Sequence, residues 1–412
     1  MMDVVRQTAK AGRLVIWEEV ARDGAQAKTL MNANQRVAIA RATGALFGQH
    51  GPHHVIFAAG LPAVSREEAE IMRQLADQVD NCTLAHHGRA RREDIDLGVN
   101  ALRGAKHGRL TFFIPMSAPM AAAMGLGTPE AALARGLDIL AYALDKGGGM
   151  PVDVALMDTV NTDPRAAAEA AMMLHDGGAA IIKLCDTIGG FYPVACGRFF
   201  DTFFASLDDD VVIGVHQHND LGFALANNLE AVRAGARVVS SSWLGLGERN
   251  GLAPTEQTIF ALGFDRDTLS DRLGCVADFW LTPPDLTGIV QIARTVSEFV
   301  GIPIRVTDAI VGTGVNSIST GTPFRERRVF MPFDPLKVLG TKAEVKLTHL
   351  ASRAVIVAVA AEAGVTLEAP VVEAALHWVK HKAYQQGSAE VSKATFLEYL
   401  RQQSSEAASA RA

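Results

Sequence analysis

The amino-acid sequence predicts an α/β fold, a (β/α)8 TIM barrel followed by a small helical C-terminal extension. Eight short apolar runs alternate with eight longer, Ala-rich amphipathic stretches between residues 13 and 263. The runs are continuously apolar, as expected for parallel strands that are covered on both faces. Eight such units over about 250 residues match the length of a closed barrel. A doubly wound open sheet is the rival, but eight uninterrupted repeats favour the barrel, and no GxGxxG motif follows the first run.

Each expected strand is one of these apolar runs, from RLVIWEE at the first to ARVVSSS at the last, and each helix is the amphipathic stretch that follows. The expected strands are residues 13–19, 53–59, 81–86, 109–115, 151–157, 179–185, 210–217 and 236–242. The expected helices are residues 32–49, 65–79, 93–104, 128–146, 163–176, 193–206, 222–234 and 253–263. This order of strand and helix is typical of βα units around a parallel sheet.

The alternation of apolar runs and amphipathic stretches ends after about residue 265. LTPPDLTGIVQIARTVSEFVGIPI indicates a helix with a linker, and VGTGVNSISTGTPFRERRVFMPFDP is rich in turn residues. Three helical stretches then follow, with a C-terminal tail that is expected to fray. We therefore expect a catalytic barrel at residues 1–265, a linker and lid-like subdomain at 266–342, and a helical subdomain at 343–412.

Composition and charge exclude several classes of partner. The chain of 412 residues is 49% hydrophobic and 20% charged, with a net charge of -6 and interspersed signs. Such a balance favours neither nucleic acid nor an anionic membrane surface. The four cysteines form no CxxC motif, which is typical of a reduced cytoplasm. The N-terminal segment holds no apolar stretch long enough for a signal peptide or a membrane span, so we expect a cytoplasmic protein.

The barrel prediction says where to look for chemistry, because active sites of such barrels lie at the carboxyl ends of the strands. Several polar residues stand where the expected strands end. They are Arg22, Asp23 and Gln26 after the first strand, MDTVNTD (157–163) after the fifth, Asp186 and Thr187 after the sixth, His216 and His218 after the seventh, and GLGERNG (245–251) after the eighth.

The two histidines at the end of the seventh strand are spaced by two residues. Residues i and i+2 of a strand point to the same face, so both imidazoles can reach one spot. Closure of the barrel brings Asp23, at the end of the first strand, beside the last strands. His216, His218 and Asp23 would then form a catalytic metal site with open positions for water or substrate. The alternative is that the histidines are polar rim residues with ordinary hydrogen bonds.

Two further rim residues have a functional and a structural interpretation. Arg22 could polarise a carbonyl or stabilise an enolate oxygen, or it could form a rim salt bridge with Glu18 or Glu19. Thr187 and the glycines after it could bind a substrate carboxylate, or they could close a turn between strand and helix.

Charged residues of two later segments also have a functional and a structural interpretation. Glu248 and Arg249 could orient each other at the site or form a structural ion pair. Arg325 and the two arginines that follow it could meet an anionic cofactor or substrate, or they could lie in a solvated turn or a subunit contact.

Four segments together resemble a known family. ARDGAQ, KLCDTIG, HQHNDLGFALANN and GLGERNGLAPTE are similar to the signature segments of metal-dependent Claisen-condensing (β/α)8 enzymes. These include isopropylmalate synthase, homocitrate synthase and the Re-type citrate synthase; the wider superfamily contains hydroxymethylglutaryl-CoA lyase and carboxyltransferase barrels. The resemblance covers roughly residues 13 to 340.

The resemblance implies an acyltransferase that condenses acetyl-CoA with a 2-oxo acid and then hydrolyses the thioester, to give a malate- or citrate-type product. It implies a divalent metal ion (Zn, Mn, Mg or Co), a small-molecule 2-oxo acid, acetyl-CoA as co-substrate, and a homodimer. The resemblance does not assign the general base, which could be Asp158, Glu248 or a metal-bound water. The implied site residues are Asp23, His216 and His218 for the metal, Arg22 for the keto oxygen, and Gln26, Ser117, Thr187, Asn219 and Arg325 for substrate.

The sequence departs from the family pattern at positions next to the expected substrate. Met157 replaces a usual Glu, Met120 a usual His and Leu252 a usual Asn, and ISTGTP replaces a segment that contains His. The STGTPFRERR run would suit an extra anionic group, as in the oxo acids that give phosphonomethyl- or phosphinomethylmalate. The chain beyond residue 343 is expected to be too short for the leucine-regulatory domain of isopropylmalate synthase.

Three rival functions remain. A hydroxyacyl-CoA lyase of the same superfamily would run the reverse reaction. That lyase carries a Cys in the loop after the last strands, whereas the corresponding GLGERNG contains no Cys. A biotin-dependent carboxyltransferase would carry Lys directly before Asp186, where this chain has Cys185. A non-catalytic relative that has kept part of the site is the third.

Overall fold

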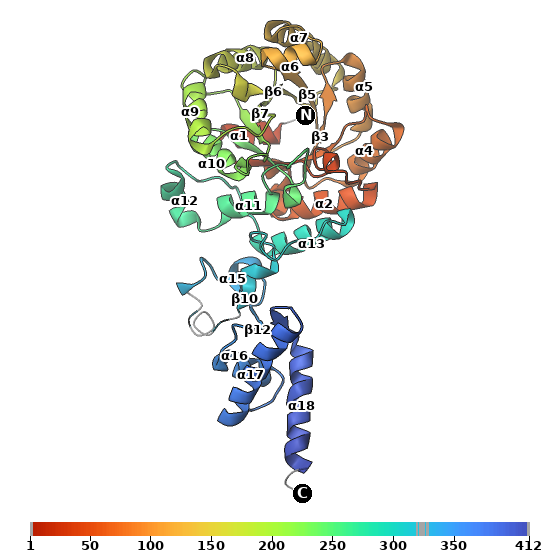
Figure 1. Ribbon diagram of the computed structural model, residues 1–412. Coiled ribbons are helices and arrows are strands. Elements are labelled where there is room, and N and C mark those ends of the chain that lie inside the picture. The colour runs from red at the N-terminus through yellow and green to blue at the C-terminus, as the bar shows by residue number, and fades with distance from the viewer. Residues whose placement is uncertain (1–2, 319, 321–325, 327–328, 410–412) are drawn as a thin grey trace. The chain divides into compact units, whose positions relative to one another are not determined.

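A computed structural model describes residues 3–318, 320, 326 and 329–409 (Figure 1). The chain divides into two compact units, Met1–Ile304 and Arg305–Ala412. The first unit thus includes residues 266–304, which the sequence placed in a linker and lid-like subdomain. The three-part division of the chain remains a proposal.

The first unit is a closed parallel barrel, which confirms the predicted fold. Among the described residues, eight strands close the ring through parallel pairing of the first with the last and of the third with the next long strand. A ninth, two-residue strand, β4 (Gly88–Arg89), adds to the edge of β5. The barrel strands are β1 (Val15–Glu18), β2 (Val55–Gly60), β3 (Thr83–His86), β5 (Gly108–Pro115), β6 (Val152–Met157), β7 (Ile182–Asp186), β8 (Ile213–Gln217) and β9 (Val238–Ser241).

A ring of helices surrounds the strands, as the view along the barrel in Figure 1 shows. Several of these helices begin at side chains that cap free backbone N–H groups: Asn32, Ser65, Thr128 and Asp163. Asn32 forms a reciprocal capping box with Gln35. The helices are α2 (Ala33–Ala45), α4 (Arg66–Gln78), α5 (Arg92–Ala101), α7 (Pro129–Lys146), α8 (Pro164–Asp176), α9 (Pro193–Phe204), α10 (Ala224–Ala234) and α11 (Thr255–Gly263), with the short α3 (Gly51–His54) and α6 (Ala118–Ala123) between them.

A short N-terminal helix, α1 (Val4–Lys10), packs against the barrel core, although the sequence predicted no element there. Its Val5 and Ala9 are buried in one cluster with barrel residues such as Trp17. Arg109, at the start of β5, donates to Asp153 at 2.6 Å and to Asp3 at 3.2 Å. This buried ion pair ties the start of α1 to two strands.

Two helices follow the barrel within the first unit, α12 (Arg266–Leu273) and α13 (Ile289–Val300). The buried face of α13 presents Ile289, Ile292, Ala293 and Val296, and this helix contacts α2. The apolar spacing of one helical face explains why it packs on the barrel rather than standing free.

The second unit is mainly helical, as expected for the C-terminal part. Its core is formed by apolar side chains of three helices, among them Val359, Val379 and Phe396. Two small pairings add to it: β10 (Ser317–Ile318) runs parallel to β11 (Glu344–Val345), and β12 (Leu347–Thr348) runs antiparallel to β13 (Glu390–Val391). The helices are α15 (Pro335–Leu339), α16 (Arg353–Glu362), α17 (Ala369–Gln385) and α18 (Lys393–Ser409).

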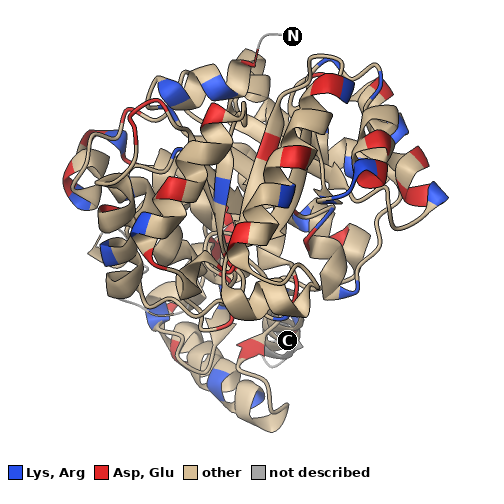
Figure 2. Ribbon diagram, turned by 90° about the horizontal axis from the view of Figure 1, so that it is seen from above, with Lys and Arg blue, Asp and Glu red and all other residues tan. Residues whose placement is uncertain are grey.

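Charged residues of both signs are mixed along the chain, as the composition predicts. Figure 2 shows Lys and Arg interspersed with Asp and Glu along the helices of the barrel. Among the described residues, no helix combines the length and apolarity needed to cross a bilayer.

Candidate metal centre and substrate cavity

Three potential metal ligands converge at the carboxyl ends of the barrel strands. His216 lies in β8, His218 stands just beyond it, and Asp23 follows β1. One ligand atom from each lies within 4.8 Å of the other two, and all three residues are buried. The centres of the two imidazole rings are 5.0 Å apart, and Nε2 of His216 lies 3.7 Å from Oδ2 of Asp23. The spacing of two along the strand and the closure of the ring therefore bring together the set that the sequence singled out.

The Asp23 carboxylate is held from several sides. Its Oδ1 accepts the backbone N–H of Glu248 at 2.9 Å, and its Oδ2 accepts from Gln26 at 3.3 Å. A guanidinium nitrogen of Arg22 lies 3.0 Å from the same Oδ2. Gly247 is required beside it, because a Cβ at that position would lie 2.8 Å from Oδ1. The loop after β9 thus fixes a carboxylate that follows β1.

The protonation states of the three side chains fit a divalent cation. Burial lowers the pKa of His216, and it lowers that of His218 to about 4, so both imidazoles are neutral near pH 7. Burial alone would raise the pKa of Asp23, but Arg22 and His216 outweigh it and the pKa is below its usual value. Nδ1 of His218 is buried and has no hydrogen-bond partner among the described residues. Neutral imidazoles and a carboxylate are the forms that bind such a metal.

Arg22 satisfies parts of both interpretations made from the sequence. Its Nε donates to Oε2 of Glu19 at 2.9 Å, so the rim salt bridge is present. The same side chain also lines the cavity beside Asp23. Glu18 takes no part, because its Oε1 accepts the backbone N–H groups of Val20 and Trp243.

A cavity of about 560 Å³ opens next to the three potential ligands. Part of its lining is apolar and comes from the ends of β2, β5 and β6, with Leu61, Phe113, Ala155 and Met157. The polar lining consists of Arg22, Asp23, Gln26, Thr29, Arg36, Glu68, His87, Lys183, Thr187, His216, His218 and Glu248.

Thr187, Asp158 and Ser117 are linked by hydrogen bonds at the ends of neighbouring strands. Thr187 lines the cavity, and its Oγ1 accepts the backbone N–H of Asp158 at 2.8 Å. The Asp158 carboxylate accepts from the Ser117 hydroxyl and, at 2.9 Å, from the Asn161 amide. Neither Asp158 nor Ser117 is among the residues that line the cavity.

Of the remaining predicted site residues that the structure describes, two line the cavity and one does not. Gln26 and Glu248 line the cavity, and the Glu248 side chain is 47% exposed and lies 3.2 Å from Arg249. The Asn219 side chain accepts the backbone N–H of Ala224 at 3.1 Å, at the start of α10. Arg325 lies outside the described residues.

Three buried polar residues of the barrel interior were not assigned to the site from the sequence: Lys183, His87 and Glu19, the last of which was considered only as a salt-bridge partner of Arg22. All three lie close to one another, and Lys183 and His87 line the cavity. The sequence did contain an indication of this cluster. A charged residue inside an apolar strand, as in AAIIKLC, needs a buried partner of opposite charge. The partner itself lies 164 positions away in the chain and could not be identified from the run.

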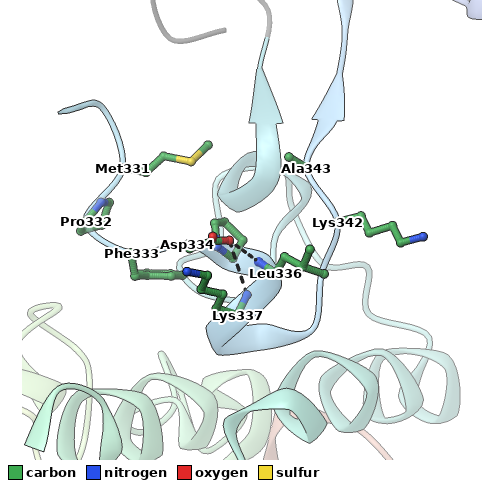
Figure 3. Close-up of a pocket in the computed structure, with 9 residues that line it drawn as sticks. Met331, Pro332, Phe333, Asp334, Leu336, Lys337, Lys342 and Ala343 are labelled. Atoms are coloured by element: carbon green, nitrogen blue, oxygen red, sulfur yellow. Dashed lines mark hydrogen bonds between the residues drawn. The ribbon is translucent and has the colours of Figure 1, made fainter. Parts of the chain in front are cut away.

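A second cavity, of about 570 Å³, lies within the second unit and is lined by residues 331–337, 342 and 343. Its Asp334 accepts the N–H groups of Leu336 and Lys337 and so caps α15. Figure 3 shows Lys342 directed away from Lys337, so the two ammonium groups do not converge on one point. The cavity presents no cluster of groups comparable to the first.

Comparison with known proteins identifies relatives of the barrel. The model of the HMGL-like family matches residues 13–296. The 2-isopropylmalate synthase of Clostridium kluyveri is 29% identical over 312 residues, which cover 75% of this chain and 57% of that protein. The 2-isopropylmalate synthase 1 of Caldanaerobacter subterraneus is 31% identical over 303 residues, covering 73% and 72%. The chain thus spans little more than half of the length of the first relative.

Solved structures share the fold. The hydroxymethylglutaryl-CoA lyase of Pseudomonas aeruginosa superposes with a TM-score of 0.56 at 19% identity, over 71% of this chain and 93% of that chain. The carboxyl transferase domain of Rhizobium etli pyruvate carboxylase does so with a TM-score of 0.52 at 17% identity, over 72% and 47%. At these identities the likeness concerns the barrel alone.

Proposed function

The chain belongs to the HMGL-like family, and from that membership we propose that it is an acyltransferase that condenses acetyl-CoA with a 2-oxo acid. The methyl carbon of acetyl-CoA would add to the keto carbon, and hydrolysis of the thioester would release the product and CoA. Relatives named 2-isopropylmalate synthase support this reaction class. The observation that carries it is the convergence of Asp23, His216 and His218 on one wall of a cavity that Arg22 and Thr187 also line.

The residues at the site fit distinct tasks in such a condensation. Asp23, His216 and His218 would hold a divalent cation, which when bound supplies Lewis acidity toward a ketone. Arg22 lies beside Asp23 and can donate a charged hydrogen bond to the keto oxygen. The Thr187 hydroxyl already accepts a backbone N–H, so its proton is free to bond to the substrate carboxylate. A cavity that holds both reactants lowers the entropic cost of joining them.

Of the two carboxylates considered as the general base, the geometry favours Glu248. Its side chain lines the cavity, is partly exposed, and is joined through its own backbone N–H to Asp23. Asp158 faces Ser117 and Asn161 instead. We therefore assign to Glu248 the removal of the methyl proton of acetyl-CoA, and to Asp158 the support of Thr187 through its backbone.

The identity of the oxo acid is a separate proposal. A phosphorus-bearing substrate, suggested by the STGTPFRERR run, depends on Arg325, which lies outside the described residues. Within the described cavity, the wall formed by Phe113, Ala155 and Met157 is apolar and suits an uncharged side chain. Both kinds of oxo acid therefore belong in the same test.

The test uses the purified, metal-loaded protein with acetyl-CoA and a panel of 2-oxo acids that includes 2-oxoisovalerate, 2-oxoglutarate, oxaloacetate and phosphonopyruvate. We expect release of free CoA thiol with at least one oxo acid and none without it, and a product mass equal to oxo acid plus acetate. Cleavage of a hydroxyacyl-CoA, with no thiol release across the panel, would replace the synthase by the lyase. A homodimer, also proposed, is checked by sedimentation velocity on the same sample.

A further inference from the structure

A buried carboxylate lies directly behind the potential metal ligands, inside the barrel. Glu19 follows β1 and is 0% exposed, and Lys183 of β7 is 2% exposed. Ions are rarely buried so completely unless each one is paired. Glu19 is not one of the three potential ligands, and its carboxylate has no part in the reaction proposed above.

Glu19 contacts four groups that converge on its two oxygens. Oε2 accepts from Arg22 at 2.9 Å. Oε1 accepts from Nζ of Lys183 at 3.1 Å, and it lies 3.4 Å from Nδ1 of His216 and 3.8 Å from Nε2 of His87. The guanidinium of Arg22 and the ammonium of Lys183 thus each form an ion pair with this one buried carboxylate.

The two nitrogens of His216 face different partners. Nε2 lies on the side of Asp23, at 3.7 Å, and Nδ1 lies on the side of Glu19, at 3.4 Å, where it is buried and forms no hydrogen bond among the described residues, so that the Glu19 charge acts on it at close range. A carboxylate next to Nδ1 favours the tautomer that keeps the proton there and leaves the lone pair on Nε2. That is the tautomer in which His216 can bind a metal together with Asp23 and His218.

We propose that Glu19 is a positioning residue for the metal centre, which orients His216 in its ligand form and holds Arg22 beside Asp23. Lys183 balances the charge of Glu19, and its ammonium also lies 3.9 Å from the ring centre of Trp17. This inference rests on the metal site of the proposed function. It assigns to Glu19 and Lys183 opposite effects on the affinity for a cation, although both contribute to one buried ion pair.

The test measures metal binding directly, without turnover. Glu19→Gln keeps the shape of the side chain and removes its charge, whereas Lys183→Met keeps the length of the stem and leaves the carboxylate less compensated. Metal-free protein is titrated calorimetrically with Mn²⁺, and with Co²⁺ while the visible absorption of the bound cobalt is recorded. Glu18→Gln is the matched control, because Glu18 is the adjacent residue, is buried as fully, and within the described part of the chain accepts from the backbone N–H groups of Val20 and Trp243.

We expect Glu19→Gln to weaken binding of both cations by roughly 10–100-fold and to change the cobalt spectrum, as for other partners of metal-bound histidines. Lys183→Met should bind as tightly as the wild type or more tightly, and Glu18→Gln should bind unchanged. Both changes at the ion pair should lower the thermal midpoint of the metal-free protein. A merely structural pair would lower the midpoint in both and leave both affinities unchanged, which would overturn the proposal, as would equal weakening in both.

Two further outcomes are separated by the same titrations. If Glu19→Gln does not fold, Glu19→Asp replaces it: the charge is kept but withdrawn from Nδ1, and unchanged affinity would again overturn the proposal. If the wild-type protein itself binds neither cation, the metal of the proposed function fails together with this inference. If the wild type binds and Glu19→Gln binds equally well, only the role of Glu19 fails.

Discussion

At the scale of single residues, unusual backbone conformations collect at the rim that carries the proposed chemistry. Lys28, Asp158, Leu244 and Arg249 all have positive φ angles, of 63°, 59°, 59° and 55°. Each stands in a loop that follows a barrel strand. Such conformations cost free energy and persist where surrounding contacts require them. At Asp158, the conformation accompanies the bond from its N–H to Thr187, which ties two loops of the rim together.

Asp23→Asn removes the one negative charge among the three potential ligands. We expect the affinity for Mn²⁺ to fall by more than roughly 100-fold, because changes to outer-shell groups alone cost 10–100-fold, and acetyl-CoA turnover to fall with it. Calorimetric titration and the thiol-release assay check this. His107→Asn, before β5 at the opposite end of the barrel, should change neither, and full affinity in Asp23→Asn would contradict the ligand assignment.

The pH dependence of stability should report His54, a buried histidine outside the site. Its Nδ1 contacts the Leu14 carbonyl oxygen at 2.7 Å, and its Nε2 accepts the Leu281 N–H at 3.0 Å. Burial lowers its pKa from 6.5 to about 4. The unfolded chain therefore binds more protons between these values, and the free energy of unfolding should fall as the pH drops from 6.5 toward 4.

The measurement is urea denaturation of the metal-free protein at several pH values in that window. His54→Asn should lower stability at pH 7, where two hydrogen bonds are weakened, and should show a shallower fall with decreasing pH. A slope that is the same in both proteins would show that His54 does not carry the effect.

At the scale of elements, the strands were the best predicted, because each is a continuous apolar run whose hydrophobicity is visible without its neighbours. The helix expected at 32–49 ends at Ala45, and the chain then turns through Gly48, with φ 55°, into the short α3. The Gly and Pro residues of GQHGPHH explain this end, since they favour turns over a continued helix. The helix α1 was missed because its seven residues include only a short apolar face.

The ion pair that joins α1 to the barrel offers a prediction for stability. Arg109→Met would leave the Asp153 carboxylate, which is 0% exposed, without its cation. Breaking one side of a buried pair costs about 3–5 kcal/mol. Asp3→Asn should cost about 1 kcal/mol or less, because Arg109 keeps Asp153 and Asn also caps a helix. Urea denaturation checks both; equal losses would contradict the dominance of the Asp153 contact.

At the scale of the whole molecule, the two units separate the proposed chemistry from the helical C-terminal part. All three potential ligands, Glu19 and the lining of the cavity lie within Met1–Ile304. The second unit has an apolar core of its own. A chain truncated after Ile304 should therefore keep the affinity of the full chain for Mn²⁺ within about threefold, a change in free energy below about 1 kcal/mol.

The truncated chain is checked by circular dichroism and then by calorimetric titration beside the full chain. Lost affinity in a folded truncated chain would show that the second unit contributes to the metal site. Comparison of thiol release in the two chains then shows whether residues after 304 are needed for turnover.

The sequence by itself determined the features that depend on local pattern. Apolar runs at regular intervals predict the barrel, the barrel predicts the rim, and two histidines two residues apart on a strand share one face. The family resemblance also rests on local pattern, because it is visible in four short segments of the sequence. These inferences needed no knowledge of which distant residues touch.

Only the tertiary structure decided which polar groups meet. Glu19 reaches Lys183 across 164 positions, and the Asp158 carboxylate, a candidate base from its place at a strand end, bonds to Ser117 across 41. Strand order tells which ends are neighbours, but the direction of a side chain and the pairing of a buried charge depend on the whole closed barrel. For that physical reason the potential ligands could be predicted from the sequence, whereas the contacts of Glu19 with Lys183 and His216 could not.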